Sequence, residues 1–176
     1  MNVCVASPYP LTDLKGNSVT THRIVEILQE HGINARGCHG FDGQPADILI
    51  SLHAVKGARA VADFRDAYPE GKVVILITGT DIYQFLPEGS REGDRALKAA
   101  DAIVVVFDRA VQSLDVRWRK KAFVVPSSLS PVHVVAQPVC PPFAISVVGH
   151  LRPVKQPFLT IEAVARHPGW KDVEVW

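Results

Sequence analysis

The sequence predicts an α/β protein with a doubly wound parallel sheet, and two observations support this prediction. Short runs of Val, Ile and Leu alternate along the chain with stretches of helical spacing, as in repeated βαβ units. The runs are nearly continuous, which is typical of strands that helices cover on both faces. The expected strands are residues 3–6, 48–50, 73–77, 102–106 and 122–125.

The stretches between these strands have the features of helices. Residues 18–31 carry Ile24, Ile27 and Leu28 at helical spacing and are followed by Gly32, a common helix stop. We expect further helices at residues 55–68, at residues 91–100 and directly after Asp108.

Composition and charge exclude several classes of protein. Of the 176 residues, 47% are hydrophobic and 21% are charged, which suits a packed core and excludes general disorder. The 19 basic and 18 acidic residues give a formal net charge of +1, which argues against a nucleic-acid partner. No apolar run approaches the roughly 18–20 residues that span a bilayer, so there is no strong membrane signal. The chain has no basic start typical of a signal peptide, and we expect a soluble cytoplasmic protein.

No metal or cofactor motif stands out in the sequence. Cys4, Cys38 and Cys140 are scattered and form no CxxC pair, which argues against a disulfide scaffold and a zinc knuckle. The histidines have no metal-ligand spacing, and no Ser/His/Asp order is evident. A GxGxxG fingerprint is absent after the first strand, so a nicotinamide cofactor has little support. We therefore expect no metal and no bound cofactor.

A change in composition divides the chain into two parts. Residues 126–142 contain five prolines and interrupt the alternation of strands and helices, so we interpret them as a linker after a first domain at residues 1–125. Residues 143–176 then hold a strand at 144–148, a helix at 157–166 and a last strand at 173–176. A single βαβ unit leaves its edges and faces uncovered, so we expect it to be the start of a second domain.

The loop after the first strand is a candidate anion site. Gly16 would permit close approach of a ligand, Asn17 and Ser18 are candidate capping residues, and Thr20 follows in the first turn. Open α/β sheets bind ligands at the carboxyl ends of their strands, and helix starts favour anions. The alternative is an ordinary capped helix after a turn.

Thr78, Gly79, Thr80 and Asp81 follow the strand at residues 73–77 directly. Two hydroxyl groups and a carboxylate around a glycine offer donors and an acceptor to a polar ligand. The alternative is a turn that Asp81 caps. A second polar loop on the same edge of one sheet favours a binding site.

His53 and Lys56 follow the strand at residues 48–50 on the same edge. His53 could orient or protonate a ligand, and Lys56 could neutralise an anion, although a lone histidine is often a structural hydrogen-bonding group. The acidic residues within positions 94–101 are interpreted as a solvated helix face.

His150, Arg152 and Lys155 surround the turn after the first strand of the second part. Two fixed cations and a third possible one beside Gly149 suit a diphosphate, because arginine can bind two oxygens at once. The alternative is a loop of solvated basic residues.

Together these motifs resemble the N-terminal half of GT-B glycosyltransferases of the broad retaining family 4 group. Within that group they are most similar to the selenosugar synthases of selenoneine biosynthesis. The matching segments occur in the family's order and cover almost the whole chain, at residues 16–21, 47–54, 78–83, 99–105 and 148–158.

The resemblance implies two Rossmann-like domains with the active site in the cleft between them. Residues 1–125 would be the acceptor-side domain, and residues 143–176 the first unit of a truncated donor-side domain. Gly16 would approach the donor phosphate. Lys155 matches the family's diphosphate-binding lysine, whereas His150 stands where the family has arginine and Arg152 comes two residues later. Thr80 replaces the histidine of a frequent His-Asp pair.

The implied reaction transfers a sugar from a UDP-sugar, UDP-N-acetylglucosamine, to selenophosphate and gives a selenosugar. An anionic acceptor needs no base, which fits the loss of that histidine. The chain alone is expected to be inactive without a donor domain, supplied as a partner or as further sequence. The alternative is a non-catalytic Rossmann-like module that binds an anion or a protein partner, and self-association is a further possibility.

Overall fold

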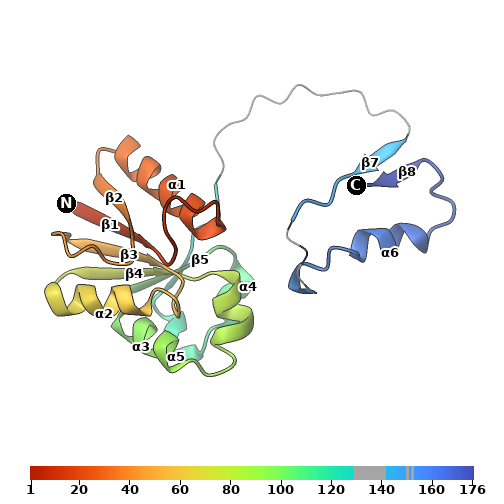
Figure 1. Cartoon of the computed structure of the whole chain (residues 1–176). Helices are drawn as coiled ribbons and strands as arrows, with labels where there is room; N and C mark the ends of the chain where they lie inside the picture. The colour runs from red at the N-terminus through yellow and green to blue at the C-terminus, as the bar shows by residue number, and fades with distance from the viewer. Residues whose placement is uncertain (129–141, 150, 152) are drawn as a thin grey trace. The chain divides into compact units, whose positions relative to one another are not determined.

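The structure, a computed structural model, describes residues 1–128, 142–149, 151 and 153–176 (Figure 1). The chain divides into two compact units, Met1–Ser128 and Leu129–Trp176, and each is described by itself. Most of the expected linker, residues 129–141, lies outside the described residues.

The first unit is built on one parallel sheet, as the sequence predicts, with six strands where the sequence indicates five. The strand order is β2-β1-β3-β4-β5-β6, so the chain moves outward from β1 in one direction and then returns to build the other side. The strands are β1 (Asn2–Ser7), β2 (Asn34–His39), β3 (Ile48–Leu52), β4 (Lys72–Leu76), β5 (Ala102–Val105) and β6 (Ala122–Val124).

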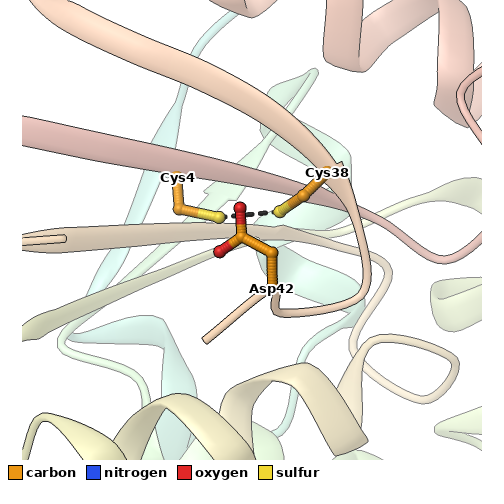
Figure 2. Close-up of side chains that lie close together, drawn as sticks. All are labelled: Cys4, Cys38 and Asp42. Atoms are coloured by element: carbon orange, nitrogen blue, oxygen red, sulfur yellow. Dashed lines mark hydrogen bonds between the residues drawn. The ribbon is translucent and has the colours of Figure 1, made fainter. Parts of the chain in front are cut away.

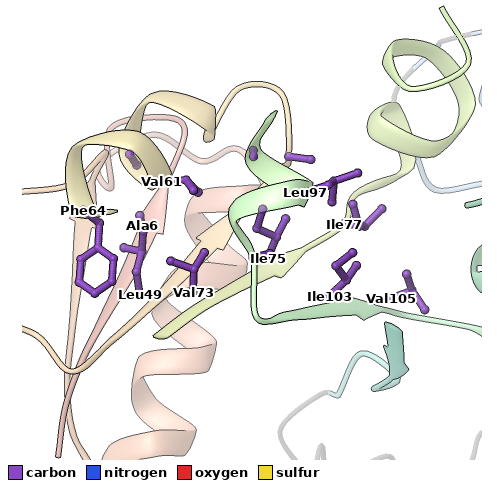
Figure 3. Close-up of a cluster of buried hydrophobic side chains, with 14 of the residues drawn as sticks. Ala6, Leu49, Val61, Phe64, Val73, Ile75, Ile77, Leu97, Ile103 and Val105 are labelled. Carbon is purple, nitrogen blue, oxygen red and sulfur yellow. The ribbon is translucent and has the colours of Figure 1, made fainter. Parts of the chain in front are cut away.

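Helices cover both faces of this sheet (Figure 1). Helix α1 packs its apolar residues against Val3 and Val5 of β1, whereas Cys4 and Ala6 face the core on the other side. The remaining helices belong to that second core, in which Phe64, Ile75 and Leu97 are fully buried (Figure 3). The helices of the unit are α1 (Gly16–Glu30), α2 (Ala58–Ala67), the π-helix η1 (Asp81–Phe85), α3 (Arg91–Ala99), α4 (Asp108–Ser113) and α5 (Val116–Arg119).

Strand β2 is an element that the sequence pattern does not predict. Its six residues, NARGCH, contain two apolar side chains, because β2 is an edge strand with a partner on one side only. Pairing with β1 fixes its register, with Asn34 opposite Asn2 and Cys38 opposite Ala6.

One acidic residue expected on a solvated helix face has a structural role instead. The Asp101 carboxylate accepts hydrogen bonds from the backbone N–H of Val73, at 2.8 Å, and from the guanidinium of Arg65, at 2.5 Å. It therefore ties the start of β5 to β4 and to helix α2.

The second unit is smaller. Strands β7 (Phe143–Ile145) and β8 (Val173–Val175) pair in parallel, and the 3₁₀ helix η2 (Pro153–Lys155) and helix α6 (Leu159–Ala165) lie between them in sequence. Several of its large apolar side chains are exposed, among them Phe158, Ile161 and Trp170. Across the described parts of both units, no helix has the length and apolar character needed to cross a bilayer.

Candidate functional site

The strand order singles out one position of the sheet at which a ligand is expected to bind. Because β1 and β3 are neighbours and the helices that follow them, α1 and α2, cover opposite faces, the loops after these strands diverge. In open α/β sheets a divergence of this kind, at the carboxyl ends of the strands, is where ligands bind. The loops that follow β1, β3 and β4 are therefore the ones that can form a site.

His53 directly follows β3 and is held in an unusual backbone conformation. Its φ of 74° is in the left-handed region, and its side chain is 1% exposed. The backbone N–H of His53 donates to the Leu76 carbonyl at 2.9 Å, which continues the pairing of β3 with β4. The turn closes at Gly57, where a Cβ atom would lie 2.6 Å from the His53 carbonyl oxygen and 2.3 Å from Ser51 Oγ. A tight glycine turn thus fixes the imidazole at the end of β3.

Asp81 is fully buried and organises the turn after β4. One carboxylate oxygen, Oδ2, accepts from the backbone N–H of Thr78 at 2.9 Å and from Thr78 Oγ1 at 3.0 Å. The other, Oδ1, accepts from the N–H of Val55 at 3.2 Å. These contacts agree with the interpretation of Asp81 as a residue that caps the turn. The carboxylate points into the protein rather than toward solvent.

A hydroxyl, an imidazole and a carboxylate form one hydrogen-bonded chain between these two loops. His53 Nδ1 lies 2.6 Å from Asp81 Oδ1, and His53 Nε2 lies 3.0 Å from Thr80 Oγ1. We place a proton on Nδ1, because two lone pairs at 2.6 Å would repel each other. The N–H of Lys56, 3.2 Å from the same Nδ1, is then a contact rather than a hydrogen bond. In this tautomer Nε2 accepts a hydrogen bond from the Thr80 hydroxyl.

The sequence predicts that His53, Thr80 and Asp81 lie on the same edge of the sheet. It does not predict that the three side chains are hydrogen-bonded to one another. The three residues come from two loops that are far apart in sequence, and no spacing rule connects them. The useful signal is that two polar loops follow adjacent parallel strands.

Two lysines and a tyrosine lie beside the hydrogen-bonded side chains of Thr80, His53 and Asp81. The ammonium group of Lys56 donates to Tyr9 Oη at 2.6 Å and lies 5.7 Å from the centre of the Phe85 ring. The ammonium group of Lys15 lies 4.2 Å from the centre of the Tyr9 ring and pairs with Asp13 at 2.8 Å. Tyr9 follows β1, and the sequence pattern does not single it out. It links the loop after β1 to the loop after β3, and we call Tyr9, Lys56 and Thr80 the rim cluster.

The expected capping of helix α1 by Asn17 or Ser18 is wrong. Lys15 is the N-cap residue and makes no side-chain capping bond, while Ser18 Oγ is buried and donates to the Pro10 carbonyl at 3.0 Å. Gly16 is exposed, and a Cβ atom there would have no neighbour within 4 Å. Within the described ranges, Gly16, Asn17 and Thr20 form no hydrogen bond to His53 or to the rim cluster.

Gly79 is exposed in the turn between Thr78 and Thr80, with a Cβ position 3.9 Å from the Tyr83 ring. In the second unit, Lys155 is the last residue of η2 and is exposed. His150 and Arg152 lie outside the described residues, so the structure leaves the expected diphosphate cluster as a prediction.

A groove of the first unit is lined by residues outside these loops. It has a volume of about 540 Å³ and is formed by the residues after η1, the start of α3 and helix α5, with Leu86, Arg95 and Trp118 among its lining.

One group of three metal-ligand side chains lies close together in the described residues. It consists of Cys4, Cys38 and Asp42, whose ligand atoms all lie within 4.8 Å of one another (Figure 2). These residues belong to β1, β2 and the loop after β2, and their spacing in sequence marks none of them as a ligand.

Comparisons with known proteins add little. No family model matches the chain, and no curated protein matches it. A solved structure described as "two RcsB dimers bound to two parallel DNAs" is similar over 71% of this chain and 63% of that chain, with 15% sequence identity and a TM-score of 0.40. At that level the likeness carries no argument about what this chain does.

Proposed function

We propose that the first unit is the acceptor-side domain of a glycosyltransferase that moves a sugar from a UDP-sugar to a small anionic acceptor. The observation that supports this most is the convergence of three loops at the divergence point of the sheet. Tyr9 comes from the loop after β1, Lys56 from the loop after β3 and Thr80 from the turn after β4. The proposal also uses the sequence resemblance to GT-B enzymes, in which this edge faces the second domain.

The charge of this edge suits an anion. Lys56 is exposed and has an aromatic and a hydroxyl neighbour in the described residues but no carboxylate partner. Its ammonium group can exchange the Tyr9 hydroxyl for a phosphate oxygen, and such charge-assisted contacts are stronger than neutral ones. Thr80 is half-buried, and its hydroxyl can donate to the same ligand by giving up its hydrogen bond to His53 Nε2.

The acceptor we propose is selenophosphate, and the structure changes the argument for it. The sequence suggests that the site has no base, yet His53 occupies a place beside Thr80 and Asp81. The imidazole is buried, so it would act on a substrate proton through the Thr80 hydroxyl rather than directly. An anionic acceptor needs no such proton transfer. The proposal for selenophosphate therefore depends on the cationic edge and the resemblance, not on the absence of a base.

The donor in this proposal is UDP-N-acetylglucosamine, held by a donor-side domain that begins with the second unit. Lys155, His150 and Arg152 are the proposed diphosphate-binding residues. Transfer then requires both domains, so the chain by itself is expected to bind the acceptor without transferring sugar.

A titration with thiophosphate, a more stable analogue of selenophosphate, tests acceptor binding on the chain itself. Amide resonances of residues 9, 56 and 78–81 should shift with saturation in nitrogen-15 NMR spectra. Lys56→Gln should weaken binding by about tenfold or more, as loss of a charged hydrogen bond does. Lys98→Gln, which removes the same charge from an exposed helical position, is the matched control. No saturable binding would contradict the acceptor site.

A non-catalytic, anion- or partner-binding module is the second candidate. It is favoured by the fact that both imidazole nitrogens of His53 and both oxygens of Asp81 already have partners within the protein. A transfer assay with UDP-N-acetylglucosamine and selenophosphate separates the two candidates, in a protein that joins this chain to a complete donor-side domain. Formation of a selenosugar, detected by mass spectrometry, supports the enzyme; anion binding without product supports the module.

A further inference from the structure

Two buried thiols from neighbouring strands are in direct contact. Cys4 Sγ and Cys38 Sγ lie 2.7 Å apart, although the residues are 34 positions apart in sequence (Figure 2). Cys4 is opposite Arg36 and Cys38 is opposite Ala6 in the parallel pair of β1 with β2. The two side chains are therefore diagonal neighbours on one face of the sheet, and both belong to the larger core.

Asp42 completes a group of three metal-ligand side chains, but its contacts do not favour a metal. Both carboxylate oxygens of Asp42 are held by Arg36, with Nε to Oδ2 and Nη2 to Oδ1 each at 2.9 Å. A metal at this position would have to displace a guanidinium. Two thiolates on one zinc ion, at about 2.3 Å each in tetrahedral geometry, lie about 3.8 Å apart, farther than these sulfurs.

We propose that Cys4 and Cys38 form an oxidisable dithiol, which hydrogen peroxide converts to a disulfide across β1 and β2. The two sulfurs need to approach by roughly 0.6–0.7 Å to reach a bond of about 2.05 Å. Strand β2 is at the edge of the sheet, with a neighbour on one side only, so a shift of this size does not have to propagate through the other strands.

The two thiols differ in a way that assigns their roles. Cys4 is fully buried, whereas Cys38 is 8% exposed and comes near the end of β2. The hydrogen bond from the Cys4 thiol lowers the pKa of Cys38 against the opposing effects of burial and of the Asp42 carboxylate, and the Arg36 guanidinium acts in the same direction as the Cys4 thiol. The same hydrogen bond, together with burial, raises the pKa of Cys4. We therefore assign Cys38, the more exposed of the two, as the thiolate that meets the oxidant once its thiol has given up its hydrogen bond to the Gly40 carbonyl, and Cys4 as the thiol that resolves the product.

The reaction has two balanced steps. The Cys38 thiolate attacks one oxygen of hydrogen peroxide, the O–O bond breaks, and a sulfenic acid and hydroxide form. Cys4 sulfur then attacks the Cys38 sulfur, the S–O bond breaks, and the departing hydroxide leaves as water with the Cys4 thiol proton. The proton that the Cys38 thiol releases on ionisation converts the hydroxide of the first step to water. The sum is two thiols and one peroxide giving one disulfide and two waters, so two electrons pass from the sulfurs to the peroxide.

The experiment uses the full chain with Cys140→Ser, which removes the third cysteine. After treatment with a small excess of hydrogen peroxide, intact mass should fall by about 2 Da and both thiols should become unreactive toward a thiol reagent in denaturant. The melting temperature should rise by about 5–10 °C, because the bond closes a long loop. Dithiothreitol should reverse all three changes.

Single variants in the same background keep the test decisive. Cys4→Ala should leave Cys38 to gain oxygen, with a mass increase of about 16 or 32 Da, whereas Cys38→Ala should leave Cys4 unmodified. Circular dichroism confirms that each variant is folded. Oxygen gain without the 2 Da loss in the protein that retains both thiols would overturn the proposal. So would stoichiometric zinc in the purified protein that protects both thiols.

Discussion

The imidazole of His53 and the carboxylate of Asp81 lie 2.6 Å apart in the interior of the first unit, with side chains 1% and 0% exposed. They join the end of β3 to the turn after β4, as do the contacts of His53 with Thr80 and of Val55 with Asp81. Because Asp81 also accepts from the N–H groups of Thr78 and Val55, its charge is compensated by dipoles as well as by the imidazole. This pair is the structural centre of the proposed site.

Replacing Asp81 by asparagine should destabilise the protein. The amide keeps the shape of the carboxylate, but one of its two positions becomes a donor that faces other donors. Loss of hydrogen bonds to a buried charged acceptor predicts a decrease in the free energy of unfolding of about 2–4 kcal/mol. Urea denaturation followed by circular dichroism measures it.

Asp63→Asn is the matched control for that experiment. Asp63 pairs with Arg59 on the exposed side of helix α2, and such pairs contribute about 0.3–0.5 kcal/mol. If Asp81→Asn lowers the free energy of unfolding by no more than Asp63→Asn does, the buried pair does not stabilise these loops.

Gly57→Ala should damage the same loops through backbone crowding. The added methyl group would lie 2.6 Å from the His53 carbonyl oxygen and 2.9 Å from the Leu52 carbonyl oxygen, neither of which can rotate away. We expect the free energy of unfolding to decrease by about 1–3 kcal/mol, as is typical of overpacking, and the His53 side chain to be displaced. Denaturation and the chemical shifts of the His53 ring measure the two effects, and unchanged shifts would show that the turn does not position the imidazole.

The ion pair of Asp101 predicts a pH dependence of stability. Burial opposes ionisation of Asp101, but the Val73 N–H and the Arg65 guanidinium outweigh it and hold the pKa of Asp101 below its usual range. A carboxyl group with a lowered folded-state pKa stabilises the fold above its unfolded pKa of about 3.9 and loses that contribution as the pH falls through the folded pKa. The advantage of the native chain over Asp101→Asn should be constant above about pH 5 and should shrink below about pH 4. An advantage that stays constant down to about pH 2 would contradict this assignment.

Exposed apolar side chains of the second unit predict self-association. Phe158, Ile161 and Trp170 are each at least half exposed, and large exposed apolar areas are usually interfaces. Light scattering should show a mass that rises with concentration, and the double change Phe158→Ser and Ile161→Ser should reduce it. The matched control is Leu14→Ser with Val116→Ser, two exposed apolar positions of the first unit. A concentration-independent monomer would contradict the prediction.

The buried strands are predictable from the sequence, because a continuous apolar run such as that of β4 is typical of a strand covered on both faces. Strand β2 is not predictable in this way, since its polar residues are tolerated at the edge of a sheet, and the contact of Cys4 with Cys38 is missed for the same reason. The polar loops after β3 and β4 are correctly predicted to be neighbours on one edge. Their internal contacts depend on side-chain direction, which spacing in sequence does not contain.

Gly16 separates the proposed function from the stability of the fold. A side chain at Gly16 meets no atom of the protein within 4 Å, and this first helical position is exposed, so Gly16→Val should change the free energy of unfolding by no more than about 0.5 kcal/mol. If a donor phosphate approaches the start of α1, as the resemblance implies, the valine side chain would occupy its place. In a protein with both domains, Gly16→Val should then prevent binding of UDP-N-acetylglucosamine.

Lys155→Ala provides the second half of this test. It should weaken the binding of the same donor by about 1.5–3 kcal/mol, the value of a lost charged hydrogen bond. Isothermal titration calorimetry with the UDP-sugar measures both variants, and melting temperatures verify their folds. Thiophosphate binding should remain within about twofold of the native value in Lys155→Ala, since Lys155 is proposed to bind the donor and the rim cluster the acceptor. Normal donor affinity in Gly16→Val would remove the start of α1 from the site, while the rim cluster would still be tested separately by Lys56→Gln.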